Sequence, residues 1–290
     1  MLECVVNVSE GRDADLVGRL GVAAGQCLLD VHRDVDHNRS VFTLAGPHEA
    51  LAESVRSLAH ATVAHLDLRL HRGVHPRIGV LDVVPFVALK PGDPDGALVD
   101  GDTETAIGAR NRFARWAGDT LALPCFLYGP ERTLPQLRRH AWHDMAPDTG
   151  PPAPHPSAGA AAVGARGVLV AYNLWLDGDG LGGADLVVAR QIAKDLRGPA
   201  VRTLGLAVGG GAQVSCNLIA PGEVGPADVF DAVARRAAVA RAELVGLLPR
   251  RALLAIPRHR WDELGVGPAS TIEARLEEAG LDGGRFASGC

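Results

Sequence analysis

The stretch that decides the fold class is SVFTLAGPHEALAESVRSLAHATVAHLDLRLHRGVHPRIGVLDVVPFVAL, residues 40–89. It begins with Ser40–Ala45, whose alternating side chains predict a strand. The next segment, His48–Leu66, repeats apolar residues at helical spacing and predicts an amphipathic helix whose apolar stripe covers a sheet. The valine-rich segment Ile78–Leu89 then predicts a buried strand. A strand, an amphipathic helix and a buried strand in this order indicate an α/β layer.

The pattern extends outward from this stretch in both directions. A strand at Leu2–Val8, a helix at Asp13–Ala24 and a strand at Cys27–His32 complete the order β-α-β-β-α-β. The same order returns after residue 160, in segments at Val168–Leu176, Ala184–Leu196, Val201–Ala207, Gln213–Ile219, Ala227–Ala240 and Glu243–Leu248. We therefore predict an α/β (α+β) fold of two subdomains, residues 1–164 and 165–290, each with a ferredoxin-like sheet and helix layer.

Further elements lie between the two repeats of this order. The sequence predicts a helix at Glu104–Trp116, a strand at Pro124–Tyr128 and a helix at Leu134–Trp142. Asp144–Gly159 is rich in proline and small residues, so we expect it to connect the two lobes. Gly209–Gly211 lacks the lysine and the following helix of a phosphate loop, and a tight hairpin explains it better.

Composition narrows the function classes. The 290 residues are 47% hydrophobic and 22% charged, with a net charge of −5, which is typical of a globular protein and argues against a nucleic-acid partner. The five cysteines form no C-x-x-C pair and are expected to be reduced thiols. The chain starts without the pattern of a signal peptide and holds no membrane-length apolar run, so we expect a cytoplasmic protein and no membrane partner.

The densest polar cluster is the loop His71–Arg77, between the amphipathic helix and the buried strand. Histidine can act as a general base or acid near neutral pH, and arginine binds carboxylate or phosphate, so the cluster suits an anionic substrate. His71 and His75 also have the i, i+4 spacing of metal ligands, but Gly73 and Pro76 argue against the helix that such a site needs. The third interpretation is structural: the side chains cap the helix end and bind loop carbonyls.

A second polar cluster, Asp34–Ser40, lies between two strands of the first repeat. It could orient a histidine and bind a carboxylate, or it could be a solvated turn rich in aspartate and asparagine. Asn7–Arg12, which closes the first strand, could contribute polar side chains to the same sheet edge. Ser215 and Cys216 lie in a predicted strand and are interpreted as structural, so we expect no covalent nucleophile.

Taken in order, these clusters resemble the formiminotransferase family. Glu3–Arg12 is similar to the family's opening E-C-V-P-N-F-S-E-G, and Asp36–Thr43 to its N-R-[ST]-V-x-T segment in the form common among bacterial members. His71–Phe86 resembles H-K-G-E-H-P-R-M-G-A-L-D-V-C-P-F almost throughout. Later matches in the same order are Leu127–Gly129, Gly164–Arg166, Asn173, Gln213–Ser215, Asn217–Leu218 and Glu243–Leu247. The resemblance covers nearly the whole chain.

The resemblance implies a transferase that moves a formimino group from N-formimino-L-glutamate to tetrahydrofolate, in one-carbon metabolism and histidine degradation. It implies folate as co-substrate without a metal, two α/β subdomains with folate in a cleft between them, a homodimer, and catalysis by His75. Gly150–Gly159 falls at the family's proposed folate-binding stretch. The resemblance also implies a stand-alone transferase without the fused cyclodeaminase. The substrate-binding or folate-binding candidates are Asn7, Asp36, His37, Asn38, Arg39, Arg72, Arg77, Gly150, Pro151, Gly159 and Arg166.

The chain departs from the family pattern at four positions. Val6 replaces a proline, Val74 an acidic residue beside His75, and Ala158 an aromatic residue in the folate stretch. His32 stands where animal members have an acidic residue, so Asp34 or Asp36 would take over any orienting role. The departures leave open another amino-acid donor or acceptor, or transfer of formyl groups.

The predicted mechanism gives His75 two proton transfers. It accepts a proton from the attacking N5 of tetrahydrofolate and donates one to the departing amine, while arginines hold carboxylates. Asp36, His37 or Asn38 would orient the imidazole. The rival hypotheses are a folate-binding or scaffold protein without turnover, and a metal-dependent hydrolase.

Overall fold

The computed structural model describes residues 1–92, 97–178 and 183–282, which form two compact units. The first contains Met1–Lys90, Asp100–Gly167 and the segment that begins at Leu276. The second contains Val168–Arg275 and the residues around Leu98. Both units combine a sheet with helices, as the α+β prediction requires. The subdomain boundary between residues 164 and 165 stays a prediction.

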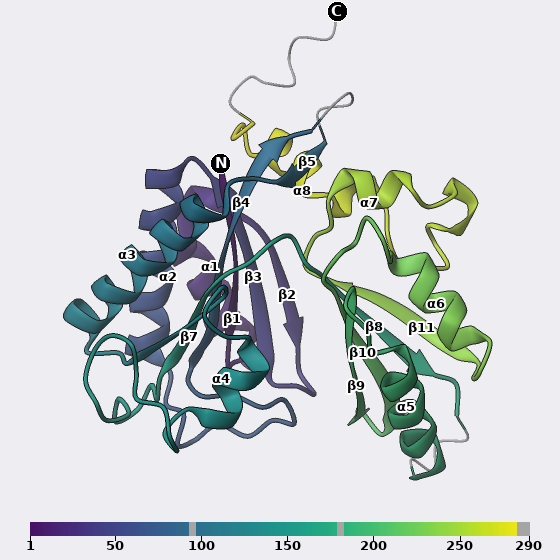
Figure 1. The fold of residues 1–290 in the computed structure, drawn as a ribbon, viewed down its shortest axis with the longest axis horizontal. Helices are drawn as coiled ribbons and strands as arrows, with labels where there is room; N and C mark the ends of the chain where they lie inside the picture. Colours follow the sequence, from purple (N-terminus) through teal and green to yellow (C-terminus); the bar gives the residue numbers. More distant parts are fainter. Residues whose placement is uncertain (93–96, 179–182, 283–290) are drawn as a thin grey trace, which may run out of the picture. The chain divides into compact units, whose positions relative to one another are not determined.

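The first unit is a mixed sheet with helices on both faces (Figure 1). Its strands run in the order β2-β3-β1-β4-β7-β6. They are β1 (Leu2–Val8), β2 (Leu28–Asp34), β3 (Arg39–Gly46), β4 (Leu81–Pro91), β6 (Cys125–Tyr128) and β7 (Ala161–Ala165), and the unit boundary falls within the short strand β5 (Leu98–Asp100). The pairs among β2, β3, β1 and β4 are antiparallel, whereas β7 is parallel to both β4 and β6.

The helices of the first unit divide between the two sheet faces. A core on one face combines apolar residues of α1 (Ala14–Ala24), α2 (His48–His65) and α3 (Thr103–Leu121) with those of the strands. A smaller core on the other face packs α4 (Leu134–His140) against β4, β6 and β7. The candidate site is formed by polar side chains of β1, β3, the loop before β4 and the start of β4.

Local signals explain where these helices begin. The Oδ1 of Asp13 accepts a hydrogen bond from the Leu16 amide at 2.9 Å, which caps α1 at the predicted residue. The predicted stripe of α2 is confirmed, because Leu51, Val55 and Leu58 are buried. The stretch that follows α2 is irregular, with a turn at residues 68–70, and contains the His71–Arg77 loop that leads to β4.

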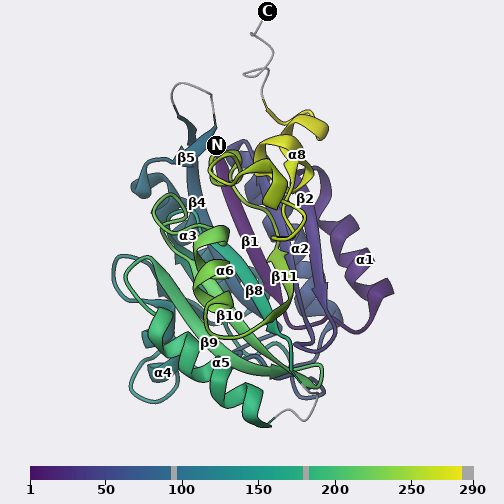
Figure 2. The ribbon, with the colours of Figure 1, turned by 90° about the vertical axis from the view of Figure 1, so that its right-hand side faces the viewer.

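The second unit repeats the β-α-β-β-α-β order (Figure 2). Its strands, in the antiparallel order β11-β8-β10-β9, are β8 (Val170–Leu176), β9 (Val201–Val208), β10 (Gly211–Leu218) and β11 (Val239–Val245). Its helices are α5 (Gly183–Leu196), α6 (Pro226–Ala234) and α7 (Arg250–Leu254), and α8 (Ile272–Glu278) follows. The first four strands of the first unit have the equivalent order, so the predicted duplication of topology is confirmed. The predicted glycine hairpin is also confirmed, since Gly209 and Gly210 turn the chain with positive φ.

Several predicted boundaries were wrong. The predicted helix at Ala227–Ala240 ends at Ala234, because the following alanines and valines pair instead with β8, where Val239 faces Leu176. The predicted strand at Ile78–Leu89 begins only at Leu81, since Gly79 bridges to Gly159. The middle helix extends five residues beyond the predicted end, Trp116, to Leu121. The sequence analysis did not predict β5, β7, α7 or α8.

The proline-rich segment Asp144–Gly159 does not connect the two units. It lies within the first unit, between α4 and the internal strand β7. Its backbone is bound to that unit at both ends: Thr149 pairs with Cys125, and the Ala158 carbonyl accepts a hydrogen bond from the Val80 amide at 2.9 Å. The prediction was wrong because a run of prolines resembles a linker even where it is fixed against a sheet edge.

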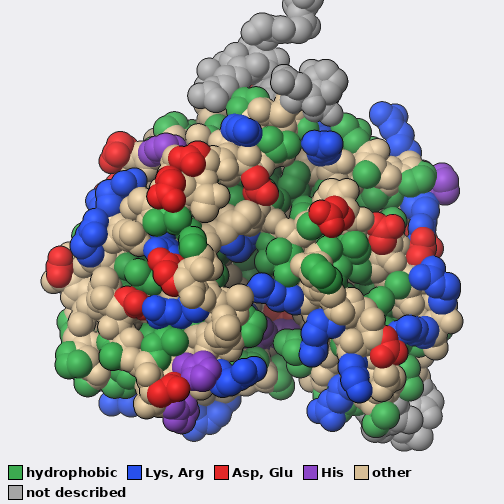
Figure 3. Space-filling model, in the orientation of Figure 1, with side chains coloured by type: hydrophobic (Ala, Val, Ile, Leu, Met, Phe, Trp, Pro, Cys, Tyr) green, Lys and Arg blue, Asp and Glu red, His purple; other side chains and the backbone are tan. Residues whose placement is uncertain are grey.

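Two further properties are the apolar character of the helices and the distribution of charged side chains on the surface. Within the described ranges, no helix combines the length and the apolar character needed to cross a membrane. On the face drawn in Figure 3, basic and acidic side chains are interspersed over the described residues of each unit.

Candidate functional site

The two polar clusters of the first unit lie against each other. The side-chain Nδ2 of Asn38 donates to the Arg72 carbonyl at 2.9 Å, and the Nε2 of His71 lies 2.9 Å from the Asn38 carbonyl. Gly73 allows this contact, because a Cβ at that position would overlap the carbonyl oxygen of His37. The turn after β2 and the loop before β4 therefore form one surface.

Asn38 is the residue that joins these loops. It has a left-handed backbone, with φ of 48°, which asparagine tolerates better than most residues. Its Oδ1 accepts a hydrogen bond from the Gly11 amide at 2.9 Å, so the loop after β1 belongs to the same assembly. Asn38 is therefore a buried residue that positions three loops, and it has no hydrogen bond to His75 among those of the described residues.

His75 presents one nitrogen for chemistry. Its Nδ1 lies 2.8 Å from the Pro76 carbonyl, which can only accept, so Nδ1 carries the proton of the neutral ring. The Nε2 then has the lone pair of a general base. The ring of His37 packs nearby, with ring centroids 6.0 Å apart. The Pro76 carbonyl thus orients the imidazole, and an orienting role of Asp36, His37 or Asn38 stays a prediction.

The surroundings keep His75 uncharged. Burial, which is the largest cause, and the positive charges of Arg39 and Arg138 together lower the pKa of His75 to about 3, against smaller opposing effects of the Pro76 carbonyl and Asp82. At neutral pH the ring is therefore neutral. The neutral ring has a lone pair that can accept a proton, and a bound anion that offsets the guanidinium charges would make it a stronger base.

The centre of the charge cluster is Asp82, whose side chain is fully buried. Its Oδ2 accepts from Arg39 Nη1 at 2.8 Å and from Arg138 Nη2 at 2.7 Å. Its Oδ1 accepts from the Ile78 amide at 2.8 Å. Burial alone would raise the pKa of Asp82, but the two guanidinium groups and the amide outweigh it and lower that pKa below its usual value. We call Arg39, Asp82 and Arg138 the Asp82 hub.

Two more residues of the sequence clusters adjoin the hub. Arg39 donates through Nε to the Oδ1 of Asn7 at 3.0 Å, which explains the polar residue at the end of β1. Arg77 donates to the His75 carbonyl through Nε at 3.1 Å and also contacts the His71 ring. The structure therefore brings together Asn7, His37, Arg39, His75 and Arg77 from the predicted set.

Sequence reasoning missed Asp82 and Arg138. Asp82 carried a signal, because it is a lone charge inside an otherwise apolar strand, and buried charges need partners. Arg138 carried none, since Arg138, Arg139 and His140 read as the solvated basic end of a helix.

Arg72 and Asp36 have structural or solvent-exposed roles. The Nη1 of Arg72 donates to the carbonyls of Arg69 and His71 at 3.1 and 2.8 Å. Arg72 therefore has the structural role of binding loop carbonyls. Asp36 is exposed in the turn after β2. The Oδ1 of Asp34 accepts a hydrogen bond from the His37 amide within that turn, and its predicted orienting role stays a prediction.

Arg166 lies far from His75 within the first unit. It follows β7, whose last residue, Ala165, pairs with Phe86. At roughly 3.3 Å per residue, this position is about 13 Å along the sheet from Asp82. The Nη1 of Arg166 donates to the Gly167 carbonyl at 2.8 Å, and its side chain lies beside Tyr128. A group held at both Arg166 and His75 would have to be long.

The predicted folate stretch spans two places in the first unit. Gly150 has φ of 82° and packs against the end of α3, where a Cβ would approach the Leu123 carbonyl; Pro151 follows it. Gly159 has φ of 73° and packs against the Ile78 carbonyl, next to the hub. His155 shapes the loop between them by accepting the Ala158 amide on Nδ1 at 3.0 Å. The Gly159 end of the stretch therefore borders the His75 loop.

The metal hypothesis finds no support in the geometry of the two histidines. His71 and His75 lie in an irregular loop, and their rings are directed to different carbonyls. Among the described residues, no group of three or more His, Cys, Asp or Glu side chains could hold a metal ion.

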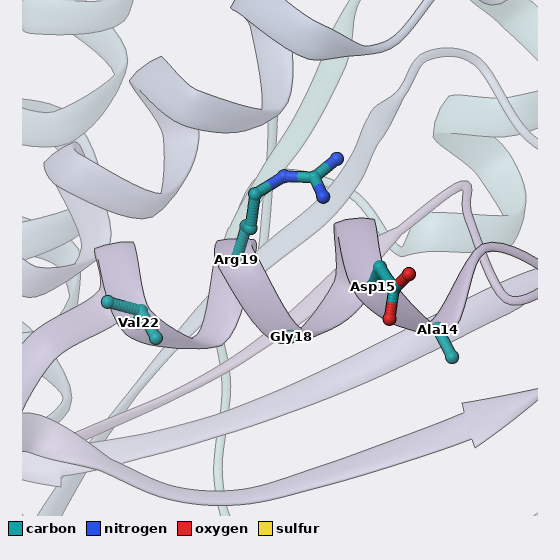
Figure 4. A pocket seen from close by; sticks show the side chains of 5 residues that line it. All are labelled: Ala14, Asp15, Gly18, Arg19 and Val22. Atoms are coloured by element: carbon teal, nitrogen blue, oxygen red, sulfur yellow. The ribbon is translucent and has the colours of Figure 1, made fainter.

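A surface hollow elsewhere in the first unit is separate from this chemistry. It follows the exposed side of α1 and is lined by Ala14, Asp15, Gly18, Arg19 and Val22 (Figure 4). One carboxylate and one guanidinium along a single helix provide no reactive group comparable to His75.

Comparison with known proteins identifies relatives over most of the chain. Residues 1–166 match the family model described as the formiminotransferase domain, N-terminal subdomain. A glutamate formimidoyltransferase of Streptococcus pyogenes serotype M1 is 32% identical, over 89% of this chain and 92% of its own. One from Thermoplasma acidophilum is 29% identical, over 96% and 98%. A formimidoyltransferase-cyclodeaminase of Gallus gallus is 32% identical over 88% of this chain, which spans 51% of that longer protein.

Proposed function

Because the chain belongs to the formiminotransferase family, we propose that it is a glutamate formimidoyltransferase acting with His75 as its proton carrier. It transfers the formimino group of N-formimino-L-glutamate to N5 of tetrahydrofolate and releases glutamate. Two relatives that match over nearly their whole length carry the name of this activity. The observation that supports the role of His75 is the contact of its Nδ1 with the Pro76 carbonyl, which leaves Nε2 of the neutral ring as the proton acceptor, within reach of the charges of the Asp82 hub.

The reaction needs a group that can accept and return one proton. N5 of tetrahydrofolate attacks the amidine carbon of the donor, the new C–N5 bond forms, and the N5 proton passes to Nε2 of His75. The imidazolium of His75 then donates that proton to the glutamate nitrogen of the tetrahedral intermediate as the bond between that nitrogen and the amidine carbon breaks. Such proton transfers typically contribute a factor of about 10² to 10⁴ in rate. Nδ1 keeps its proton throughout, because the Pro76 carbonyl accepts it.

The surrounding residues supply position and charge. The Pro76 carbonyl fixes the tautomer of His75, and Arg77 holds the backbone of the loop through the His75 carbonyl. Positive charge from Arg39 and Arg77 favours a substrate that carries carboxylates. Gly150–Gly159 is our candidate for folate contact, supported by the proximity of Gly159 to the loop through Ile78. The homodimer and the cytoplasmic location stay predictions.

An ultraviolet assay tests the proposed function. The protein is mixed with N-formimino-L-glutamate and tetrahydrofolate, and the product is measured after cyclisation to methenyltetrahydrofolate. We expect protein-dependent absorbance that requires both substrates. Tetrahydrofolate binding without product would instead support the non-catalytic folate-binding protein. Product from another formimino amino acid or a formyl donor, but none from formiminoglutamate, would support the alternative donor.

A further inference from the structure

The Asp82 hub holds more positive than negative charge. Two guanidinium groups share the single carboxylate of Asp82, and Arg77 lies close enough to feel the charges of all three residues. Asp82 is fully buried, and the side chains of Arg39 and Arg138 are 10% and 21% exposed. Uncompensated positive charge in such a place favours the binding of an anion.

Arg138 also has a hydrogen-bond donor to spare. Its Nη2 binds Asp82, but its buried Nε–H has no acceptor within the part of the chain that the structure describes. Arg39 differs, because its Nε donates to Asn7. A buried donor without an acceptor is uncommon in a folded protein and is costly in free energy. A bound carboxylate would accept a hydrogen bond from the Nε–H of Arg138, and it would also offset the excess positive charge of the Asp82 hub.

We propose that the Asp82 hub binds the α-carboxylate of the formimino donor, with Arg138 as the residue that determines specificity for an amino-acid donor. Asp82 acts through the two arginines and is a positioning residue: it holds both guanidinium groups at one point on the sheet face. The inference rests on the proposed function and names a residue of α4 as part of donor recognition.

The distance between the reacting atom and the carboxylate differs between the two substrates, and the shorter distance in the donor favours the donor as the source of the bound carboxylate. In a formimino amino acid, three covalent bonds separate the amidine carbon from the α-carboxylate carbon, which keeps them within about 4 Å. In tetrahydrofolate, the aminobenzoyl group lies between N5 and the glutamate carboxylates. A carboxylate site electrostatically coupled to His75 therefore suits the donor.

Donor binding at this place would also prepare His75 for its second role. Arg39 and Arg138 disfavour the protonated imidazole, as the low pKa of His75 indicates. A carboxylate between the arginines offsets their charge, so the imidazolium becomes less unfavourable once the donor is bound. The proton from N5 is then easier to hold until the amine departs.

The test compares Arg138→Gln with Arg139→Gln, an exposed neighbour on the same helix, using two donors. N-formimino-L-glutamate carries the carboxylate, and formamidine supplies the same formimino group without one. We expect Arg138→Gln to raise the KM for formiminoglutamate by about tenfold or more, while the KM for tetrahydrofolate stays unchanged and kcat/KM for formamidine, which has no carboxylate, changes much less. Arg138→Lys should restore part of the affinity, and Arg139→Gln should match the unmodified protein.

Two outcomes would overturn the inference. One is an equal loss with formamidine and formiminoglutamate; the other is a change in the KM for tetrahydrofolate in place of the donor. A calorimetric titration with formiminoglutamate alone separates this inference from the proposed function. If the unmodified protein transfers nothing, the proposed function fails, yet weaker donor binding by Arg138→Gln would still support the hub, and equal binding would reject it. Circular dichroism checks that the variants are folded.

Discussion

The Nη2 of Arg138, near the end of α4, lies 2.7 Å from the Oδ2 of Asp82, which is 56 residues earlier in the chain. This bond joins the α4 face of the first unit to the start of β4, where the His75 loop ends. Arg39 reaches the same oxygen from β3 at 2.8 Å. Three elements that are distant in sequence, β3, β4 and α4, are thus fixed around one carboxylate.

Asp82→Asn should destabilise the protein strongly. The substitution removes the negative charge from between Arg39 and Arg138 and leaves both guanidinium groups in a buried place without compensation. Breaking a buried pair in this way typically costs about 3–5 kcal/mol in the free energy of unfolding. Urea denaturation measures it. Asp119→Asn, on the exposed side of α3, is the matched control and should change stability little; equal stability of the two variants would contradict the role of Asp82.

His75→Ala should abolish most of the transfer activity without unfolding the protein. The ring has no described hydrogen bond beyond the one to Pro76, so its loss removes the proton carrier more than it removes packing. We expect kcat to fall by a factor of about 10² to 10⁴. The control is His60→Ala, on the exposed face of α2, with full activity. A folded His75→Ala protein with unchanged kcat would reject the assignment.

The stability of the protein should depend on pH through His75. Its pKa is about 3 in the folded protein and 6.5 in the unfolded chain, so only the unfolded chain takes up this proton between those values. Above pH 6.5 the ring is neutral in both the folded and the unfolded chain, so it does not change the free energy of unfolding. That free energy falls as the pH drops from 6.5 toward 3, because proton binding then stabilises the unfolded chain. Between pH 7.5 and 5, His75→Gln should lose about 1 kcal/mol less than the unmodified protein, after allowance for the partial exposure of the ring. Parallel pH profiles for the two proteins in urea denaturation would show that the pKa of His75 is not depressed.

Gly73→Ala should impair activity by displacing the His75 loop. The added Cβ would overlap the His37 carbonyl and crowd the Arg77 guanidinium, so the loop must move away from the turn that Asn38 holds. We expect kcat/KM to fall at least tenfold, because a small displacement of a catalytic group is costly. Gly222→Ala is the control, since a Cβ there meets open space. Steady-state kinetics measure kcat/KM for both variants. Equal values for Gly73→Ala and Gly222→Ala would mean that the close contact at Gly73 does not position the loop.

Much of the fold could be predicted because its signals are local. The alternation in Ser40–Ala45 and the apolar stripe of His48–Leu66 each depend on neighbouring residues, and both predicted elements form. The strand β7, in contrast, is a run of small residues, Ala161–Ala165, without alternation or β-branched character apart from Val163. It is a strand because β4 and β6 bind it on both sides, and that information lies outside its own sequence.

The same division applies to the candidate site. Sequence alone determined the two polar clusters, the family to which they belong, and the choice of His75 as the candidate base, since residue identity and spacing carry that information. Only the tertiary structure decided which residues surround it. Arg138 binds Asp82 from a helix end that the sequence pattern had indicated to be solvated. Arg72 binds carbonyls of its own loop, and Arg166 follows a residue that pairs with Phe86, further along the sheet. The physical reason is that a buried carboxylate such as Asp82 selects its partners by proximity in the folded chain, which separation in sequence does not reveal.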